Sequence, residues 1–392
     1  MSHVRPRALA VRVGLVAVAA TLLVSTAALA YSWNPALVLR AGSFTPSDPD
    51  LAALGPFVAA TWFEPSGPDS VWVADSTDSG GTFGTAQPVF NAPGQPTRDG
   101  AVFAGPTQEH HIAWVEKVGN GTRVYMAELP FGGTLSTPIL VSTNTGSSKT
   151  RNPVIGAEGN FIVVAYQDST GGWKAHARVY DISVPGWVSH IVLPGGAPLG
   201  KGGPSLAAGG GVLLAWTKAN GTIGRRVGTI GGFGTTFAWG TNATVANGKS
   251  AIVVLAGVSL LLYERNADVF RRLSNDGGQT FGTETKVLDG SFGTSTSAGD
   301  EYRLYDAVAY DLGFVFTAAT GPGSPALGTS YRVTSNNAGT SWTKSPALPY
   351  AGDRRQLART INAGGGPEKL AEAWLKVNPN SATWPLKYHW ES

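Results

Sequence analysis

The sequence contains no cysteine among its 392 residues, and charged residues make up only 14% of it. Without cysteine the chain forms no disulfides and no thiolate metal sites, so packing must supply its stability. The low charge, together with 10% aromatic residues, argues against disorder, because such a chain can bury enough apolar surface to offset its ordering entropy. The 52 glycines, with abundant Val, Thr, Trp and Phe, indicate many short strands joined by tight turns.

The first 30 residues have the pattern of an export signal. Arg5, Arg7 and Arg12 precede an apolar run over 13–30 that ends in a small-x-small cleavage pattern at Ala30. We therefore predict a signal peptide over 1–30. An uncleaved membrane anchor is the alternative, because the run approaches the length of a membrane span. Both readings predict a secreted or extracytoplasmic location, with membrane contact only through an uncleaved segment.

The charges of the remaining chain balance. The leader holds three arginines and no acid, so 26 of the 29 basic residues remain against 26 acidic residues. A neutral chain lacks the basic surface that nucleic-acid phosphates require, and we predict no nucleic-acid partner. We expect a monomer without a cofactor.

Seven apolar runs, each ending in an aromatic residue, recur along the chain. Their spacing of 47 to 58 residues falls in the range of propeller blades, and each run reads as a strand buried on both faces. We predict an all-β propeller of seven four-stranded blades, with six as the alternative. The run ends are Trp62, Trp114, Tyr166, Trp216, Tyr263, Phe316 and Trp374.

Three turns share the pattern S-x-D-x-G-x-T-F/W or a close variant, at 76–83, 274–281 and 335–342. An Asp or Asn side chain accepts hydrogen bonds from backbone N–H groups of its own turn, and glycine supplies positive φ. We interpret these turns as structural rather than as calcium loops, since alternating acidic ligands are missing.

The three turns resemble the Asp box of the bacterial sialidase and neuraminidase repeat family, and we call them Asp-box turns. The resemblance implies that each turn joins the third and fourth strands of a blade, away from the catalytic face. That family uses three arginines, a Tyr–Glu nucleophile and an Asp acid/base, and its first arginine lies in an Arg-Ile-Pro motif. Here Arg40 is followed by Ala41-Gly42 and no such motif occurs, so we do not expect standard sialidase activity.

The chain ends predict how the ring closes. Residues 386–390 read as the third strand of the last blade, which lacks a fourth. Residues 35–40 resemble the outer strands of other blades, so we predict that they complete the last blade. Residues 31–392 then form one propeller domain.

Basic residues recur near the start of several predicted inner strands, beside the central mouth where propellers usually bind ligands. If they converge, they form a cationic site for carboxylate or sulfate groups. The alternative is solvated turn charges paired with acids such as Asp99. The candidate ligand-binding residues are Arg98, Arg151, Lys201, Arg303 and Arg355.

The segment 300–306 concentrates acids, tyrosine and arginine at the start of an inner strand. Glu301 and Tyr302 are candidates for a Tyr–Glu nucleophile, and Asp306 is a candidate acid. The alternative is a polar strand entrance without catalysis.

Two further residue sets are weaker candidates. His110 and His111 are adjacent, and neighbours on a strand point to opposite faces, so we predict no metal site from them. Four tryptophans fall outside the repeat of buried strands and are candidates for contact with sugars. They are Trp173, Trp187, Trp239 and Trp384.

The sequence therefore favours an exported, sialidase-like propeller that acts as a binding or surface-interaction module, with acidic carbohydrate or a cell-surface molecule as its partner. The alternative is a glycan-processing enzyme, a glycoside hydrolase or polysaccharide lyase, that uses the central mouth.

Overall fold

A computed structural model describes most of the chain after residue 36. The predicted leader, Lys201 and Trp384 lie outside the described residues. The strands belong to one compact unit, Trp33–Ser392. The described ranges are 37–40, 47–65, 69–105, 109–144, 146–196, 203–266, 268–289, 300–310, 313–322, 329–346, 352–361, 368–376 and 386–390.

Strand pairing arranges the described residues in seven antiparallel sheets, which we number as blades in chain order. Blade 1 contains β2 (Ser47–Leu54), β3 (Phe57–Glu64), β4 (Ser70–Ser76) and β5 (Gln87–Val89). Blade 2 contains β6 (Thr97–Ala104), β7 (Glu109–Val118), β8 (Gly121–Pro130) and β9 (Ile139–Leu140). Blade 3 contains β10 (Thr150–Glu158), β11 (Phe161–Asp168), β12 (Lys174–Asp181) and β13 (Gly186–Leu193).

The remaining four blades follow the same order, except that blade 4 has five strands rather than the predicted four, because its fifth strand also pairs with its third. Blade 4 contains β14 (Ser205–Ala208), β15 (Val212–Thr217), β16 (Thr222–Gly231), β17 (Thr236–Trp239) and β18 (Ala243–Asn247), with a short 3₁₀ turn at Gly232–Gly234. Blade 5 contains β19 (Lys249–Val254), β20 (Ser259–Arg265), β21 (Asp268–Ser274) and β22 (Thr285–Leu288). Blade 6 contains β23 (Asp300–Tyr310), β24 (Gly313–Pro322), β25 (Thr329–Ser335) and β26 (Thr343–Lys344). Blade 7 contains β27 (Gly352–Ile361), β28 (Glu368–Lys376), β29 (Leu386–Trp390) and β1 (Leu37–Arg40).

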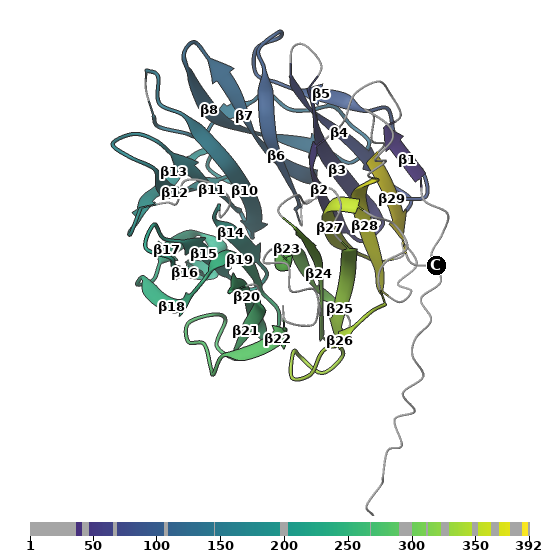
Figure 1. The fold of residues 1–392 in the computed structure, drawn as a ribbon. Coiled ribbons are helices and arrows are strands. Elements are labelled where there is room, and N and C mark those ends of the chain that lie inside the picture. The colour runs from purple at the N-terminus through teal and green to yellow at the C-terminus, as the bar shows by residue number, and fades with distance from the viewer. Residues whose placement is uncertain are drawn as a thin grey trace, which may run out of the picture. The chain divides into compact units, whose positions relative to one another are not determined.

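The first strand of each blade is the inner strand, and these seven strands form a closed ring. Each inner strand contacts the inner strand of the next blade, and β27 of blade 7 contacts β2 of blade 1. Figure 1 shows the blades following one another around this ring. The predicted β-propeller is confirmed, and the seven sheets match the count that the repeat spacing favours over six.

The predicted apolar runs are the second strands of the blades. All eight residues of β11 are buried, as expected for a strand covered on both faces by neighbouring sheets. Six of the seven run ends are at most 1% exposed: Trp62, Trp114, Tyr166, Trp216, Tyr263 and Phe316. The side chain of Trp374, the seventh, lies outside the described set.

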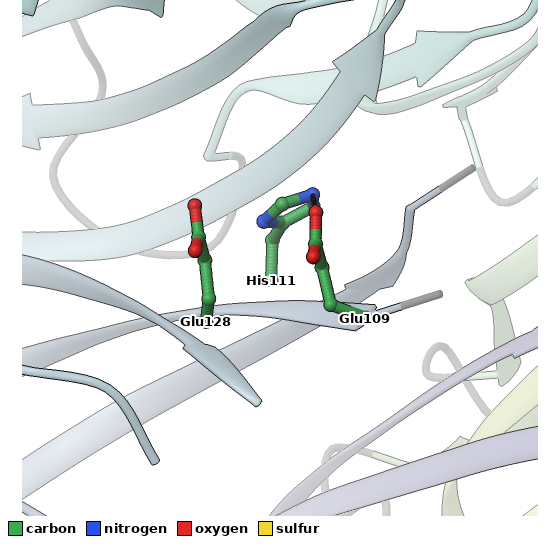
Figure 2. Close-up of side chains that lie close together, drawn as sticks. All are labelled: Glu109, His111 and Glu128. Atoms are coloured by element: carbon green, nitrogen blue, oxygen red, sulfur yellow. Dashed lines mark ion pairs between the residues drawn. The ribbon is translucent and has the colours of Figure 1, made fainter. Parts of the chain in front are cut away.

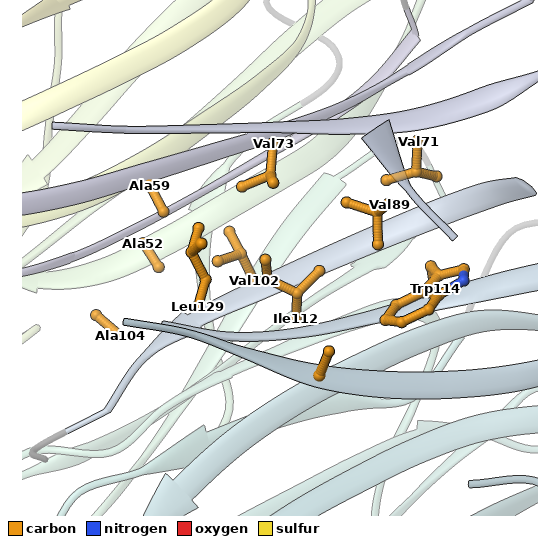
Figure 3. Close-up of a cluster of buried hydrophobic side chains, with 11 residues drawn as sticks. Ala52, Ala59, Val71, Val73, Val89, Val102, Ala104, Ile112, Trp114 and Leu129 are labelled. Atoms are coloured by element: carbon orange, nitrogen blue, oxygen red, sulfur yellow. The ribbon is translucent and has the colours of Figure 1, made fainter. Parts of the chain in front are cut away.

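The core consists of apolar layers between adjacent blades. Between blades 1 and 2, Val71 and Val73 pack against Val102, Ile112 and Trp114 (Figure 3). Burial of such side chains stabilises the fold by about 1.5–3 kcal/mol each, which replaces the disulfides that the chain lacks. Among the described residues, no helix has the length and apolar character needed to cross a membrane.

The N-terminal strand closes the ring as predicted. β1 pairs antiparallel with β29, and Leu37 lies opposite Tyr388. The pairing gives blade 7 its fourth strand from the other end of the chain. The edge of β29 is thereby covered, which removes a template for pairing with other chains.

The Asp-box turns follow the third strands β4, β21 and β25 and lead to the fourth strands. In the first turn, the Asp78 carboxylate accepts hydrogen bonds from the backbone N of Thr82 at 2.8 Å and from its hydroxyl at 2.9 Å. Asp276 makes the same two contacts with Thr280. Asn337 accepts from the backbone N of Ser341 at 2.9 Å, so Asn replaces Asp without loss of this bond. The predicted hydrogen bonds from the backbone of the turn to its Asp or Asn side chain are present in all three turns.

Candidate functional site

The inner strands begin at one end of the ring, which we call the mouth end. Each second strand returns to this end, and each third strand leaves it, because neighbouring strands in every blade are antiparallel. The Asp-box turns follow third strands and therefore lie at the opposite end. The candidate residues near the starts of inner strands share the mouth end with the loops between second and third strands.

Blades 2 and 3 begin with the same local structure. The strand register shifts between Arg98 and Ala101 in β6, and between Arg151 and Val154 in β10. Asp99 has φ 49° and Asn152 has φ 50°, in the left-handed region that Asp and Asn tolerate better than other side chains. This repeated bulge sets the direction of the arginine that precedes it in each blade.

The bulges of successive blades touch. The backbone N of Asn152 donates a hydrogen bond of 3.3 Å to Oδ2 of Asp99. At the corresponding place in blade 4, a Cβ on Gly203 would lie 2.7 Å from Cβ of Asn152, so glycine is required there. The starts of blades 2, 3 and 4 are therefore in close contact around the ring.

The positive charges of Arg98 and Arg151 both act on the Asp99 carboxylate. Burial raises the pKa of Asp99, and the nearby positive charges of Arg98 and Arg151 act in the opposite direction. Arg98 itself is exposed. The charges of both arginines thus act on one acid at the mouth end, as the paired-charge interpretation expects.

Arg151 is held in a fixed orientation. Its guanidinium carbon lies 3.9 Å from the ring centroid of Trp173, in the loop that follows β11. Its Nε donates a hydrogen bond of 2.7 Å to Oε1 of Gln167, which also accepts one of 3.2 Å from Nδ2 of Asn152. Of the three tryptophan candidates that the structure describes, Trp173 lies beside a predicted ligand-binding residue.

For the other three predicted binding residues, the structure describes the backbone of two and no side chain. The backbones of Arg303 and Arg355 lie in β23 and β27, both inner strands, but their side chains are outside the described set. Lys201 lies outside the described residues altogether. Of the five predicted binding residues, Arg98 and Arg151 are therefore the two whose side chains are seen together.

The predicted acid and nucleophile candidates lie in β23. The side chains of Glu301 and Tyr302 are outside the described set. Asp306 is half-buried, follows a register shift after Leu304, and accepts a hydrogen bond of 2.8 Å from the backbone N of Ala307. A carboxylate that bonds to the next residue stabilises the irregular strand, as in the polar-entrance interpretation.

Asp50 is an inner-strand acid that the sequence reasoning did not select. It lies in β2, and its carboxylate accepts hydrogen bonds from the backbone N of Leu51 at 3.0 Å and of Val102 at 2.8 Å. Burial raises its pKa to about 7, against the opposing effect of these two bonds. No sequence motif identifies Asp50, because its burial and its hydrogen bond from Val102 arise from the packing of blade 2 against blade 1.

A small pocket of about 250 Å³ also opens at the mouth end, between the loop before β6 and the end of β7. Its wall includes Glu116, which is buried and accepts hydrogen bonds from the backbone N of Asn91 at 2.6 Å and of Ala92 at 3.2 Å. These two hydrogen bonds offset the cost of burying the Glu116 carboxylate. The lining residues are Asn91, Ala92, Gln95, Glu116, Lys117, Val118, Gly119 and Tyr125.

Two other tryptophan candidates lie in outer strands. Trp187 in β13 packs edge-on against Tyr180, with Arg178 above its ring at 4.0 Å. Trp239 in β17 packs against Phe237, with ring centroids 5.0 Å apart. Both indoles are engaged by neighbouring side chains away from the mouth end.

No protein-family model and no curated protein matches the sequence. Solved structures match over most of the chain. An alpha-L-arabinofuranosidase from Fusarium graminearum has a TM-score of 0.52 at 13% identity, over 91% of this chain and 97% of that one. The NanB sialidase from Streptococcus pneumoniae has a TM-score of 0.47 at 12% identity, over 90% and 70%. A Hadza microbial sialidase has a TM-score of 0.49 at 13% identity, over 89% of this chain and 66% of its own.

The match to the arabinofuranosidase agrees with the strand topology in giving the chain a β-propeller fold. Identities near one residue in eight establish the fold alone. Because one fold carries many functions, the function must be argued from the residues of this chain.

Proposed function

We propose that this sialidase-like propeller is an exported binding module for acidic glycans, with Arg98 and Arg151 at the mouth end as its carboxylate or sulfate contacts. The observation that carries the proposal is that Arg98 and Arg151 lie at equivalent positions at the starts of neighbouring inner strands, with Arg151 held by Trp173 and Gln167. Export rests on the predicted leader. We expect the protein to act as a monomer at a cell surface or outside the cell.

The geometry around Arg151 favours an anionic ligand. A guanidinium group binds a carboxylate or sulfate through two parallel hydrogen bonds, provided that its plane is fixed. Trp173 and Gln167 fix that plane, so binding orders few additional atoms. Arg98 is exposed and adds a second positive charge at the equivalent position of the neighbouring blade.

The glycan part of the proposal draws on Trp173 and on fold. Trp173 is half-buried and lies beside the arginine, so an apolar ring and a cation are presented together, as a charged sugar requires. A structure of similar fold that this chain matches over 97% of its length is an alpha-L-arabinofuranosidase in complex with an iminosugar inhibitor.

Binding to defined oligosaccharides tests this function. Sialylated, uronate and sulfated oligosaccharides are compared with neutral ones by calorimetry, at two salt concentrations. We expect affinity for the acidic set only, falling with salt, and a loss of roughly tenfold or more in R98Q and R151Q, as expected for a charge-assisted pair worth at least ~1.4 kcal/mol.

Arg178→Gln is the matched control, because Arg178 also lies over an indole of blade 3 but on its third strand. Equal binding of neutral and acidic sugars, or equal losses in the R151Q and R178Q variants, would contradict an arginine site at the mouth end.

Asp50 gives one specific reason to keep glycan processing as a second candidate function. A carboxylic acid with a pKa of about 7 on an inner strand retains its proton near neutral pH, as a glycosidase general acid must. Activity on aryl glycosides and uronate polysaccharides, with Asp50→Asn and Tyr302→Phe variants, tests this candidate. Turnover that both variants retain would exclude these residues from catalysis.

A further inference from the structure

Three side chains with metal-binding atoms lie together in blade 2, at the end of the ring opposite the mouth. Glu109 and His111 are near the start of β7, and Glu128 is near the end of β8. His111 and Glu128 are direct cross-strand partners, and Glu109 lies two residues before His111, so all three leave the same face of the sheet. Their ligand atoms lie within 4.8 Å of one another. Figure 2 shows the three side chains grouped together.

His111 is a buried imidazole without a hydrogen-bond partner among the described groups. It is 1% exposed, and neither Nδ1 nor Nε2 makes a hydrogen bond. The nearest carboxylate oxygen, Oε1 of Glu109, lies 3.7 Å from Nε2, which is too far for a hydrogen bond. Buried polar atoms in native proteins nearly always have a partner, so this imidazole calls for one.

The backbone at Gly105 leaves space for the imidazole ring of His111. A Cβ on Gly105 would lie 2.5 Å from Nε2 of His111, so only glycine at this position accommodates the ring. Glu128 is anchored through its backbone, since its N–H donates to the Ser136 hydroxyl at 2.9 Å. The His111 ring and the Glu128 backbone are therefore both held in place by neighbouring residues.

We propose that Glu109, His111 and Glu128 bind a divalent transition metal ion of the Zn²⁺ class, which bridges β7 and β8. One imidazole nitrogen and two carboxylates form a ligand set that zinc accepts, with a fourth position open to water. Magnesium and calcium prefer oxygen ligands alone and make no use of the imidazole.

The distances are compatible with a shared ion. Two ligands that each bind zinc at about 2.1 Å in tetrahedral geometry lie about 3.4 Å apart. The 3.7 Å between Nε2 of His111 and Oε1 of Glu109 is close to this value. Glu128 reaches the same ion by rotation about its side-chain bonds.

The sequence-based prediction of no metal considered only the pair His110–His111. In the structure His110 lies against Phe131, with ring centroids 4.7 Å apart. The additional ligands come from the residue two positions before His111 and from the neighbouring strand, a pairing that the sequence alone does not reveal.

Zinc titration of the full chain by calorimetry, after removal of metals with a chelator, tests the site. We expect one Zn²⁺ per chain, and at least tenfold weaker binding in the isosteric double variant E109Q/E128Q. His190→Gln is the control, because His176 and His190 form the other close pair, with ring nitrogens 3.1 Å apart. Binding that E109Q/E128Q retains, or that H190Q abolishes, would overturn the proposal.

X-ray absorption at the zinc edge gives a second readout on the unmodified protein and does not depend on how a variant folds. One imidazole and two carboxylate ligands support the site. Two imidazole ligands would place the metal at His176 and His190, and a coordination shell of oxygen alone would exclude His111.

Discussion

Asp50 in blade 1 accepts a hydrogen bond of 2.8 Å from the backbone N of Val102 in blade 2, so that a carboxylate of one inner strand binds the next inner strand. Similar bonds recur around the ring between side chains and the backbone of the following blade. They join Asp99 to Asn152, Ser205 to Val253, and Glu264 to Leu304. The inner strands of consecutive blades do not pair as a sheet, so these bonds supply directional contacts that apolar packing between the blades lacks.

Asp50 should make stability fall as pH rises from about 4 to 7. Its pKa is raised from 3.8 to about 7 in the folded protein, so the folded state keeps a proton that the unfolded state releases. Stability is greatest below the unfolded pKa and is lost as pH rises through the folded pKa, by up to about 4 kcal/mol. Chemical denaturation at several pH values in this range measures the slope.

The Asp50→Asn variant isolates this contribution, because Asn carries no titratable group at the same position. The variant loses one hydrogen-bond acceptor, so its free energy of unfolding at pH 4 should be lower than that of the unmodified chain. The dependence of this free energy on pH between 4 and 7 should become weaker. A variant with an unchanged slope would show that Asp50 is not the titrating group.

The Asp-box turns predict a difference between two substitutions of Asp78. Asp78→Ala removes the acceptor for both groups of Thr82 and should destabilise the protein by about 1 kcal/mol, as for loss of a capping side chain. Asp78→Asn should cost less, because Asn337 bonds to the backbone of Ser341 in the third turn. Thermal unfolding of both variants checks the order, and equal losses would mean that the charge of Asp78 matters more than its acceptor oxygen.

The repeat explains why so much of the fold follows from the sequence. A strand buried on both faces must be apolar throughout, so each second strand is visible as a run that ends in an aromatic residue such as Trp62 or Trp114. The outer strands of a blade have mixed exposure and leave a weaker pattern. In blade 3 the outer strand, Gly186–Leu193, is largely a mixture of half-buried and exposed residues.

The candidate sites depend on contacts between segments, and these are harder to predict. The 53-residue spacing of Arg98 and Arg151 correctly places them at equivalent positions of adjacent blades. The stacking of Trp173 on Arg151 depends on the path of a loop between strands. The pairing of His111 with Glu128 depends on strand register, which turn geometry sets and composition does not.

Gly224 should be intolerant of a methyl group. It lies in β16, and a Cβ there would lie 2.4 Å from the ring of Trp216, the buried aromatic residue of blade 4. Gly224→Ala should destabilise the protein by about 1–3 kcal/mol through overpacking, because the indole has no space to retreat. Gly257→Ala is the matched control, since a Cβ at Gly257 meets nothing within 4 Å. The denaturant concentrations at the unfolding midpoints of both variants test this prediction. Equal midpoints would mean that the Trp216 ring is free to shift.

Removal of β1 should open the propeller at blade 7. A chain that starts at residue 41 lacks the strand that pairs Leu37 with Tyr388, so the backbone edge of β29 becomes exposed. We expect a lower melting temperature and concentration-dependent association, because an unpaired edge is a template for other chains. A chain that starts at residue 35 retains β1 and serves as the control. Light scattering and thermal unfolding compare the two. If the shorter chain remains monomeric and melts at the same temperature, β1 covers the edge without locking the ring, and the contacts between β27 and β2 suffice to hold it closed.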